Sequence, residues 1–192
     1  MALKLIEKGY GQLELNLVSF PRTGNIVAQY RPGTSFTKDG IKYLENGMLL
    51  KVDGKNRCVD MEAPAVGNIY ALNYSTEHMY DERQYRLADF KLNPTDDFYP
   101  RLGYLSIGDK FTTNCVCYET AKKVAEAWEE LKEEFKTKEI MGIPSAEGYI
   151  QLLVIDEGDG DADPAFAPIL RAIEITTMPD GQNAIKFEVI KA

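Results

Sequence analysis

The sequence predicts a mainly β protein of the α+β class. We expect an antiparallel β-sandwich or barrel-like sheets of about 8–10 short strands, with one long amphipathic helix and a C-terminal β-hairpin. Over most of the chain, apolar and polar residues alternate with a period of two, and clusters of Gly, Pro, Asn and Asp interrupt the alternation. In one segment the period changes to that of a helix.

The segments with the strand pattern are short, and turn-forming residues bound each of them. They are residues 13–20, 24–30, 48–52, 68–74, 86–92, 102–107, 110–118, 149–155, 170–176 and 184–190. The first two segments are expected to pair with each other, because the turn-prone stretch 21–24 separates them.

The last two segments predict a hairpin around the turn at residues 178–183. Both arms alternate, so one face of the hairpin is expected to be buried and the other to meet water. The expected buried residues are Ile173, Ile175, Ile185, Phe187 and Val189. The expected solvent-facing residues are Glu174, Lys186 and Glu188.

The helical period lies between residues 119 and 139. The apolar positions there are spaced by three and four, with charged residues between them: Ala121, Val124, Trp128, Leu131 and Phe135. This pattern predicts an amphipathic helix of about five turns over 119–139 that ends before Gly142 and Pro144. The helix is expected to lie across a sheet with Trp128 as its anchor.

The chain is expected to form one β-rich domain over residues 1–192. The alternative is a division into two lobes near residues 93–100, where Pro94 and Pro100 flank a stretch that neither period explains. Residues 1–12, which include Gly9-Tyr10-Gly11, are a candidate N-terminal arm.

Composition excludes two classes of partner. The 22 basic and 30 acidic residues give a net charge of −8, which opposes phosphate backbones, so no nucleic-acid partner is expected. The longest apolar runs, such as residues 152–155, are far shorter than the roughly 20 residues that cross a bilayer, so no membrane partner is expected. The N-terminus lacks the apolar run of a signal peptide, which predicts synthesis in the cytoplasm.

The three cysteines, Cys58, Cys115 and Cys117, are expected to be buried free thiols, because two cysteines one residue apart in a strand are badly placed to bridge. A zinc site would need two more ligands beside the Cys115/Cys117 pair, and Cys58 and His78 are the available ones. The spacing does not match a zinc knuckle, so no cofactor is expected.

The stretch "IDEGDGDADP" (residues 155–164) places five carboxylates within residues 156–163. An EF-hand loop needs oxygen ligands at positions 1, 3 and 5, glycine at 6 and glutamate at 12, but Pro164 and Leu170 occupy the last two positions here. We interpret the stretch as an exposed loop. Two alternatives stay open, a calcium site of another type and a metal-assisted hydrolase centre, which would use Asp156, Asp159, Asp161 and Asp163.

His78 is the single histidine. Ser75, His78 and Asp81 have the residue types of a nucleophilic triad, but they lie within seven residues of each other, whereas catalytic partners usually converge from separate segments. The chain is therefore expected not to be an enzyme.

Eleven tyrosines and eight phenylalanines favour protein–protein contacts, because rigid aromatic rings with a polar tip suit interfaces. The segment 74–85 is the first choice for a contact loop. The candidate interface residues are Tyr10, Tyr74, His78, Tyr80 and Tyr85.

Two phrases carry a resemblance. "YLENGMLLKVDG" (residues 43–54) and "PRLGYLSIGDKFTTNCV" (residues 100–116) resemble segments of small structural proteins of tailed-bacteriophage virions, including capsid decoration proteins. The resemblance implies a β-rich protein that binds the outside of an assembled shell, or a neighbouring virion protein, without chemistry of its own.

From the resemblance we expect a non-enzymatic virion protein of the capsid decoration type, synthesised in the host cytoplasm and located in the virion. The implied partners are the major capsid protein or other virion proteins, and a homo-oligomer is a further expectation. A tail or neck role and a host-side binding module are the alternatives. Sheet edges would suit attachment by strand addition.

Overall fold

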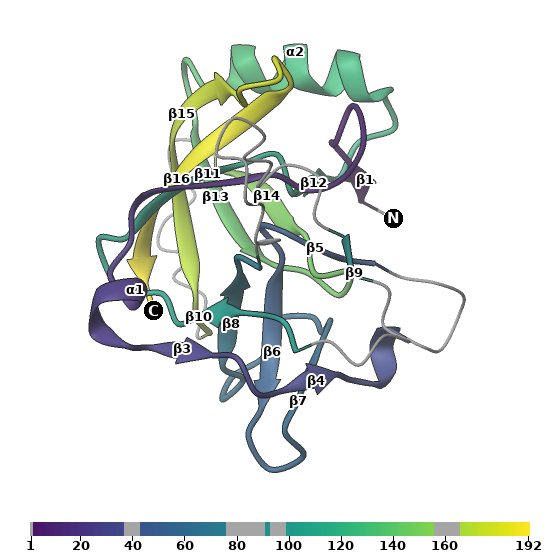
Figure 1. The fold of residues 1–192 in the computed structure, drawn as a ribbon. Helices are drawn as coiled ribbons and strands as arrows, with labels where there is room; N and C mark the ends of the chain where they lie inside the picture. Colours follow the sequence, from purple (N-terminus) through teal and green to yellow (C-terminus); the bar gives the residue numbers. More distant parts are fainter. Residues whose placement is uncertain (1, 37–42, 76–90, 93–98, 156–165) are drawn as a thin grey trace.

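Two sheets form the body of the protein in the computed structural model, which describes residues 2–36, 43–75, 91–92, 99–155 and 166–192 (Figure 1). Among these residues the larger sheet has the strand order β1-β12-β14-β13-β15-β16-β11-β2, and the smaller sheet has the order β3-β10-β8-β6-β7-β4. The strands β5 and β9 form a separate pair. In Figure 1, α2 lies at the top beside the larger sheet, and the smaller sheet lies at the bottom.

The larger sheet consists of β1 (Leu3–Lys4), β2 (Leu13–Leu17), β11 (Lys110–Thr113), β12 (Val116–Tyr118), β13 (Glu139–Pro144), β14 (Ile150–Ile155), β15 (Ile169–Thr177) and β16 (Asn183–Lys191). The smaller sheet consists of β3 (Ile26–Val27), β4 (Arg31–Pro32), β6 (Leu49–Asp53), β7 (Cys58–Asp60), β8 (Tyr70–Asn73) and β10 (Leu102–Gly103). The remaining elements are β5 (Leu44–Glu45), β9 (Lys91–Leu92), α1 (Phe20–Thr23), η1 (Thr34–Phe36) and α2 (Val124–Glu134).

The prediction of a mainly β protein is confirmed, but the sheets are mixed and not purely antiparallel. The pairs β12·β14 and β4·β7 are parallel, and the other strand pairs are antiparallel. A parallel pair needs a long crossover, and between β12 and β14 that crossover contains α2 and β13.

The larger sheet curls, because one short stretch of the chain supplies a strand near each of its two ends. β11 and β12 stand next to the two ends of the strand order, yet only Asn114 and Cys115 separate them. Two residues span only a few ångströms, so the sheet must bend to bring its ends together.

The predicted helix is shorter than expected. It was expected over 119–139, but α2 spans Val124–Glu134, and residues 139–144 form β13 instead of stopping a helix. A Cβ atom at Gly142 in β13 would collide with Ile150 and press tightly against Phe187, so the close packing of the sheet favours glycine at this position. The role of Trp128 is confirmed: its side chain is fully buried, with Ala127 and Leu131 on the same helix face.

The C-terminal hairpin is confirmed as the antiparallel pair β15·β16, and Ile185, Phe187 and Val189 are buried. Ile173 and Ile175 are only partly buried. The pairing register shifts between Ala172 and Glu174, so Leu170 and Ala172 take the buried positions, which the alternation alone did not predict.

The expected pairing of the first two strand segments is wrong. β2 pairs with β11 in the larger sheet, and β3 pairs with β10 in the smaller one. Pro21 lies in the first turn of α1, where proline is well tolerated, so the stretch forms a short helix and not a hairpin turn. The buried Asp109 carboxylate fixes the chain between β2 and α1, because it accepts hydrogen bonds from the backbone N–H of Ser19 and of Ser106, both at 2.9 Å.

The N-terminal segment expected as an arm is built into the sheet from Leu3 onward. β1 pairs with β12, and the Leu5 side chain is fully buried. The backbone N–H of Lys8 donates to the Gln182 side chain at 2.7 Å, and that of Gly11 donates to the Glu45 carboxylate at 2.6 Å. These contacts leave no free arm between Leu3 and Gln12.

Between Gly103 and Lys110 the chain passes from the smaller sheet to the larger one. This point follows the region 93–100, where a division into two lobes was the alternative expectation. Residues 93–98 lie outside the described part of the chain. One hydrophobic core contains residues from both sheets, including Leu49 and Leu72 from the smaller sheet and Phe111 and Phe187 from the larger one. The two sheets therefore share buried surface.

Candidate functional site

Most of the residues proposed from the sequence as sites lie outside the described residues. This holds for the acidic loop with Asp156, Asp159, Asp161 and Asp163, and for His78, Tyr80, Asp81 and Tyr85. In the described residues, no group of three or more His, Cys, Asp or Glu side chains is placed to hold a metal ion.

Two of the proposed interface tyrosines are described. Tyr10 is partly buried, and its ring meets Tyr43 edge-on at 5.8 Å between centroids. Tyr74 is only 7% exposed and packs on Phe20 at 4.8 Å between ring centroids, so its ring belongs to the core and is not accessible to a partner. Its hydroxyl is buried without a hydrogen-bond partner among the described residues, and burial raises its pKa.

Cys58, Cys115 and Cys117 are free thiols, and the last two are buried as expected. Burial raises the pKa of Cys115 well above its ordinary value and raises that of Cys117 to about 12. For the partly buried Cys58, burial and the nearby Asp60 carboxylate raise the pKa. A thiolate is the reactive form of cysteine, so these thiols are poor nucleophiles near neutral pH.

An ion pair between the partly exposed Lys4 ammonium and the buried Glu45 carboxylate joins β1 to β5. The Glu45 carboxylate is 3% exposed and accepts two bonds from the Lys4 ammonium, at 2.8 and 3.1 Å. It also accepts the Gly11 N–H at 2.6 Å and the Tyr149 hydroxyl at 3.1 Å. The ammonium lies 4.8 Å from the centroid of the Tyr149 ring.

The side chains of Lys4, Glu45 and Tyr149 line a cavity of about 410 Å³. The other lining residues are Tyr43, Met48, Met61 and Glu147. Burial, with the nearby Cys115 and Glu45, raises the pKa of Tyr149, so the phenol stays protonated and acts as a hydrogen-bond donor. Both Glu45 oxygens already have donors within the protein. We interpret the cluster as an internal tether that holds the N-terminal strand, because its polar groups are directed at one another.

An apolar loop between β7 and β8 has the features of a contact surface. We call residues 61–69 the contact loop. Val66 is 75% exposed and Ile69 is 60% exposed, and Ala63 and Ala65 are exposed beside them. Single exposed aliphatic side chains are ordinary, but several within one short loop are typical of interaction sites.

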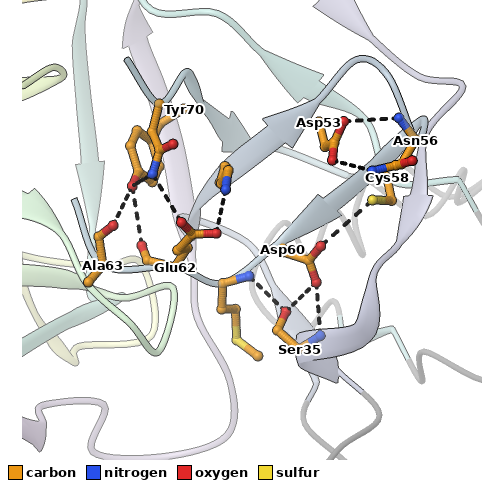
Figure 2. Close-up of polar contacts among 11 residues, drawn as sticks. Ser35, Asp53, Asn56, Cys58, Asp60, Glu62, Ala63 and Tyr70 are labelled. Atoms are coloured by element: carbon orange, nitrogen blue, oxygen red, sulfur yellow. Dashed lines mark hydrogen bonds and ion pairs between the residues drawn. The ribbon is translucent and has the colours of Figure 1, made fainter. Parts of the chain in front are cut away.

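The base of the contact loop is fixed by the buried Tyr70, as Figure 2 shows. The Tyr70 hydroxyl donates to the carbonyl of Ala63 at 2.7 Å and accepts from the side-chain amide of Asn68 at 3.2 Å. The same amide lies 3.3 Å from the Glu62 carboxylate, which forms an ion pair with Lys51 on β6. The phenol therefore connects both ends of the loop.

The tip is a tight turn. The backbone N–H of Asn68 donates to the carbonyl of Ala65 at 3.1 Å, and Gly67 has a φ of +86°, which favours glycine. The N–H of Val52 donates to the carbonyl of Ile69 at 2.8 Å. Val66 and Ile69 are thus presented on a backbone that is ordered before any partner binds.

The start of the contact loop is also fixed. Asp60 accepts from the backbone N–H and the hydroxyl of Ser35, at 2.8 and 2.7 Å, and the Ser35 hydroxyl accepts the N–H of Met61 at 2.8 Å (Figure 2). Asp53 caps the β6–β7 turn through Asn56, and hydrogen bonds from the Asn56 backbone and side chain lower its pKa. The Asp53 and Asp60 carboxylates therefore hold turns, and their oxygen atoms already accept hydrogen bonds within the protein.

The contact loop was not among the residues proposed from the sequence, because the expected interface was sought among tyrosines. One signal was available: "EAPAVGNI" (residues 62–69) places aliphatic residues on both sides of a Gly-Asn turn, where polar residues are usual.

No helix in the described residues combines the length and apolar character needed to span a membrane. Comparisons with known protein families, with curated proteins and with solved structures found no match for the chain.

Proposed function

We propose that this protein is a non-enzymatic structural component of a tailed-phage virion that binds the outside of the capsid shell through protein–protein contacts. The observation that carries the proposal is the contact loop, in which Val66 and Ile69 are exposed while Tyr70 holds the loop base. The resemblance of residues 43–54 and 100–116 to virion structural proteins supplies the kind of partner, the major capsid protein.

Physical chemistry supports a contact role for this loop. Complete burial of a valine or isoleucine side chain by a partner contributes about 1.5–3 kcal/mol each. Because the loop is already ordered, binding loses little conformational entropy there. The acidic net charge of −8 suits an outer surface better than one against packaged DNA.

The test is co-sedimentation with purified shells that lack this protein. The double variant Val66→Ser/Ile69→Ser is expected to bind at least about tenfold more weakly than the wild type, because the loop loses its apolar contacts. Ile107→Ser is the matched control, since Ile107 is an aliphatic residue that is 72% exposed and belongs to the β10–β11 turn and not to the contact loop. This variant is expected to bind like the wild type.

Three outcomes would overturn the proposal: a wild-type protein that does not sediment with shells, a loop variant that binds as well as the wild type, and absence of the protein from purified particles by mass spectrometry. Binding to isolated tails without binding to shells would reassign the protein to a tail role and would likewise overturn attachment to the capsid.

A further inference from the structure

The Glu147 carboxylate lines the cavity beside the Lys4–Glu45 pair but takes no part in the tether. The backbone N–H of Glu147 donates to Ser145 Oγ at 3.3 Å, while its partly exposed carboxylate has no hydrogen bond or ion pair within the described residues. One lysine and two glutamates supply the charges of the lining, and the Lys4 ammonium is already paired with Glu45. One negative charge of the cavity is therefore left without a counter-ion among the described residues.

The turn between β13 and β14 holds Glu147 in place. The backbone N–H of Gly148 donates to the carbonyl of Ser145 at 3.1 Å, and Gly148 has a φ of +80°, which favours glycine. The N–H of Leu49 on β6 donates to the carbonyl of Gly148 at 2.9 Å, so the turn is attached to the smaller sheet. Because this backbone is ordered before any ligand binds, a ligand that pairs with Glu147 does not have to order the turn.

The charge of Glu147 also acts on the interior of the cavity. Burial is the main cause of the raised pKa of Tyr149, followed by nearby groups that include the carboxylates of Glu45 and Glu147. Two carboxylates therefore contribute to the electrostatic field around the Tyr149 phenol, and only that of Glu45 is compensated by a cation.

The remaining walls suit the body of an organic cation. Met48 and Met61 are buried, and their flexible thioethers adapt to aliphatic chains. Tyr43 and Tyr149 add aromatic rings, which attract cations, and the Lys4 ammonium already lies 4.8 Å from the centroid of the Tyr149 ring. The cavity volume of about 410 Å³ lies within the range of about 300–1,000 Å³ that is usual for ligand pockets.

We propose that the cavity binds a lysine or arginine side chain of the protein partner, with Glu147 as the counter-ion and the aliphatic stem against Met48 and Met61. This inference rests on the proposed function, which supplies the partner. Met61 is both a wall of the cavity and the first residue of the contact loop, so a partner that covers the loop reaches the cavity. The net charge of −8 favours the approach of a basic segment. An anion fits less well, because Glu147 repels it and Lys4 already has Glu45 as its partner.

NMR of the full chain with isotope-labelled methionine methyl groups tests the site without shells. The probe is N-acetyl-lysine N-methylamide. The Met48 and Met61 signals are expected to shift with a dissociation constant of about 1 mM, the affinity usual for so small a ligand. Met141 and Met178 do not line the cavity, so their signals should stay in place. The norleucine analogue has the same stem without the ammonium group and should bind about fivefold more weakly, because it forms no ion pair.

Two glutamine variants test the role of the carboxylate. Glu147→Gln keeps the size of the side chain but removes its charge, so the lysine probe should bind about fivefold more weakly than to the wild type. Glu126→Gln is the matched control, because Glu126 is an exposed glutamate on α2 that does not line the cavity, and this variant should bind the probe like the wild type. On shells, Glu147→Gln should weaken co-sedimentation severalfold although the contact loop is unchanged.

Three results of the titration would each overturn the cation site: equal binding of the lysine and norleucine probes, equally tight binding of N-acetyl-glutamate N-methylamide, and wild-type affinity of Glu147→Gln for the lysine probe. A Glu147→Gln protein that attaches to shells as tightly as the wild type would overturn the partner's side chain as the occupant. A wild-type protein that does not sediment with shells would overturn the proposed function instead, and the titration would still measure the cation site. The two failures are therefore distinguishable.

Discussion

The indole Nε1 of Trp128 donates a 3.0 Å hydrogen bond to the backbone carbonyl of Leu5, 123 positions earlier in the chain. Both side chains are fully buried in the same core. The backbone N–H of Leu5 donates to the carbonyl of Val116 on β12 at 3.0 Å, so Leu5 is held by the helix and the sheet together. The N-terminal segment is therefore part of the folded body.

Replacing Trp128 with Phe is expected to lower the free energy of unfolding by about 1–3 kcal/mol, because the buried Leu5 carbonyl loses its donor. Urea unfolding followed by circular dichroism measures the change, since the variant removes the single tryptophan that fluorescence would report. Glu129→Ala, on the exposed face of α2, is the control and should change stability by less than about 0.5 kcal/mol. An unchanged urea midpoint for Trp128→Phe would contradict this role.

Residues 43–54 and residues 100–116 meet in the structure. Gly47, in the first segment, has a φ of +86°, and a Cβ atom there would collide with Thr113 Oγ1 and Cys115 Cβ, in the second segment. Gly47→Ala is expected to cost more than Gly108→Ala, because Gly108 also has a positive φ, +90°, but has open space around it. The difference should be about 1–3 kcal/mol, the usual effect of overpacking, as measured by urea unfolding. Equal losses would indicate that backbone conformation alone matters.

Removing the cation of the Lys4–Glu45 pair is expected to destabilise the fold. Lys4→Met leaves the buried Glu45 carboxylate without its cation, and because the Lys4 side chain is 33% exposed we expect a loss of about 1–3 kcal/mol. Adding Glu45→Gln should restore part of it, since no unpaired charge remains. Lys136→Met breaks the exposed pair with Glu133 and serves as the matched control, with an expected effect below about 0.5 kcal/mol. If both lysine variants lose the same stability, the Lys4–Glu45 pair is not a tether.

Local periodicity predicted the elements whose pattern is long and regular. The β15·β16 hairpin and the Trp128 anchor follow from alternation and from the helical spacing. Five strands escaped prediction: β1, β4, β5, β7 and β13. The first four have only two or three residues each, and β13 contains Gly142 and Pro144, which read locally as breakers. Distant partners determine such strands, because β13 pairs with β14 and β15 on its two sides.

The candidate site likewise depends on tertiary contacts that local sequence patterns do not predict. The sequence directed attention to tyrosines, but the structure places Tyr74 in the core beside Phe20. The apolar contact loop depends on Tyr70, whose hydroxyl reaches Ala63 at 2.7 Å. Composition does not show which aromatic ring serves as a scaffold, because that depends on which strand face meets the other sheet.

Burial of Cys117 predicts how stability falls at alkaline pH. Its pKa is raised from the ordinary 9.0 to about 12, mainly by burial, so the thiol ionises in the unfolded chain before it ionises in the folded one. The stabilising contribution is complete below pH 9, and it is lost progressively as the pH rises from 9 toward 12. Cys117→Ala removes it, so the wild type should lose up to about 1.4 kcal/mol more per pH unit than this variant between pH 9.5 and 11. Urea unfolding at several pH values measures the two slopes, with Cys58→Ala, a less buried thiol, as the control that should follow the wild type more closely. Parallel curves for wild type and Cys117→Ala would mean that ionisation of this thiol is not coupled to folding.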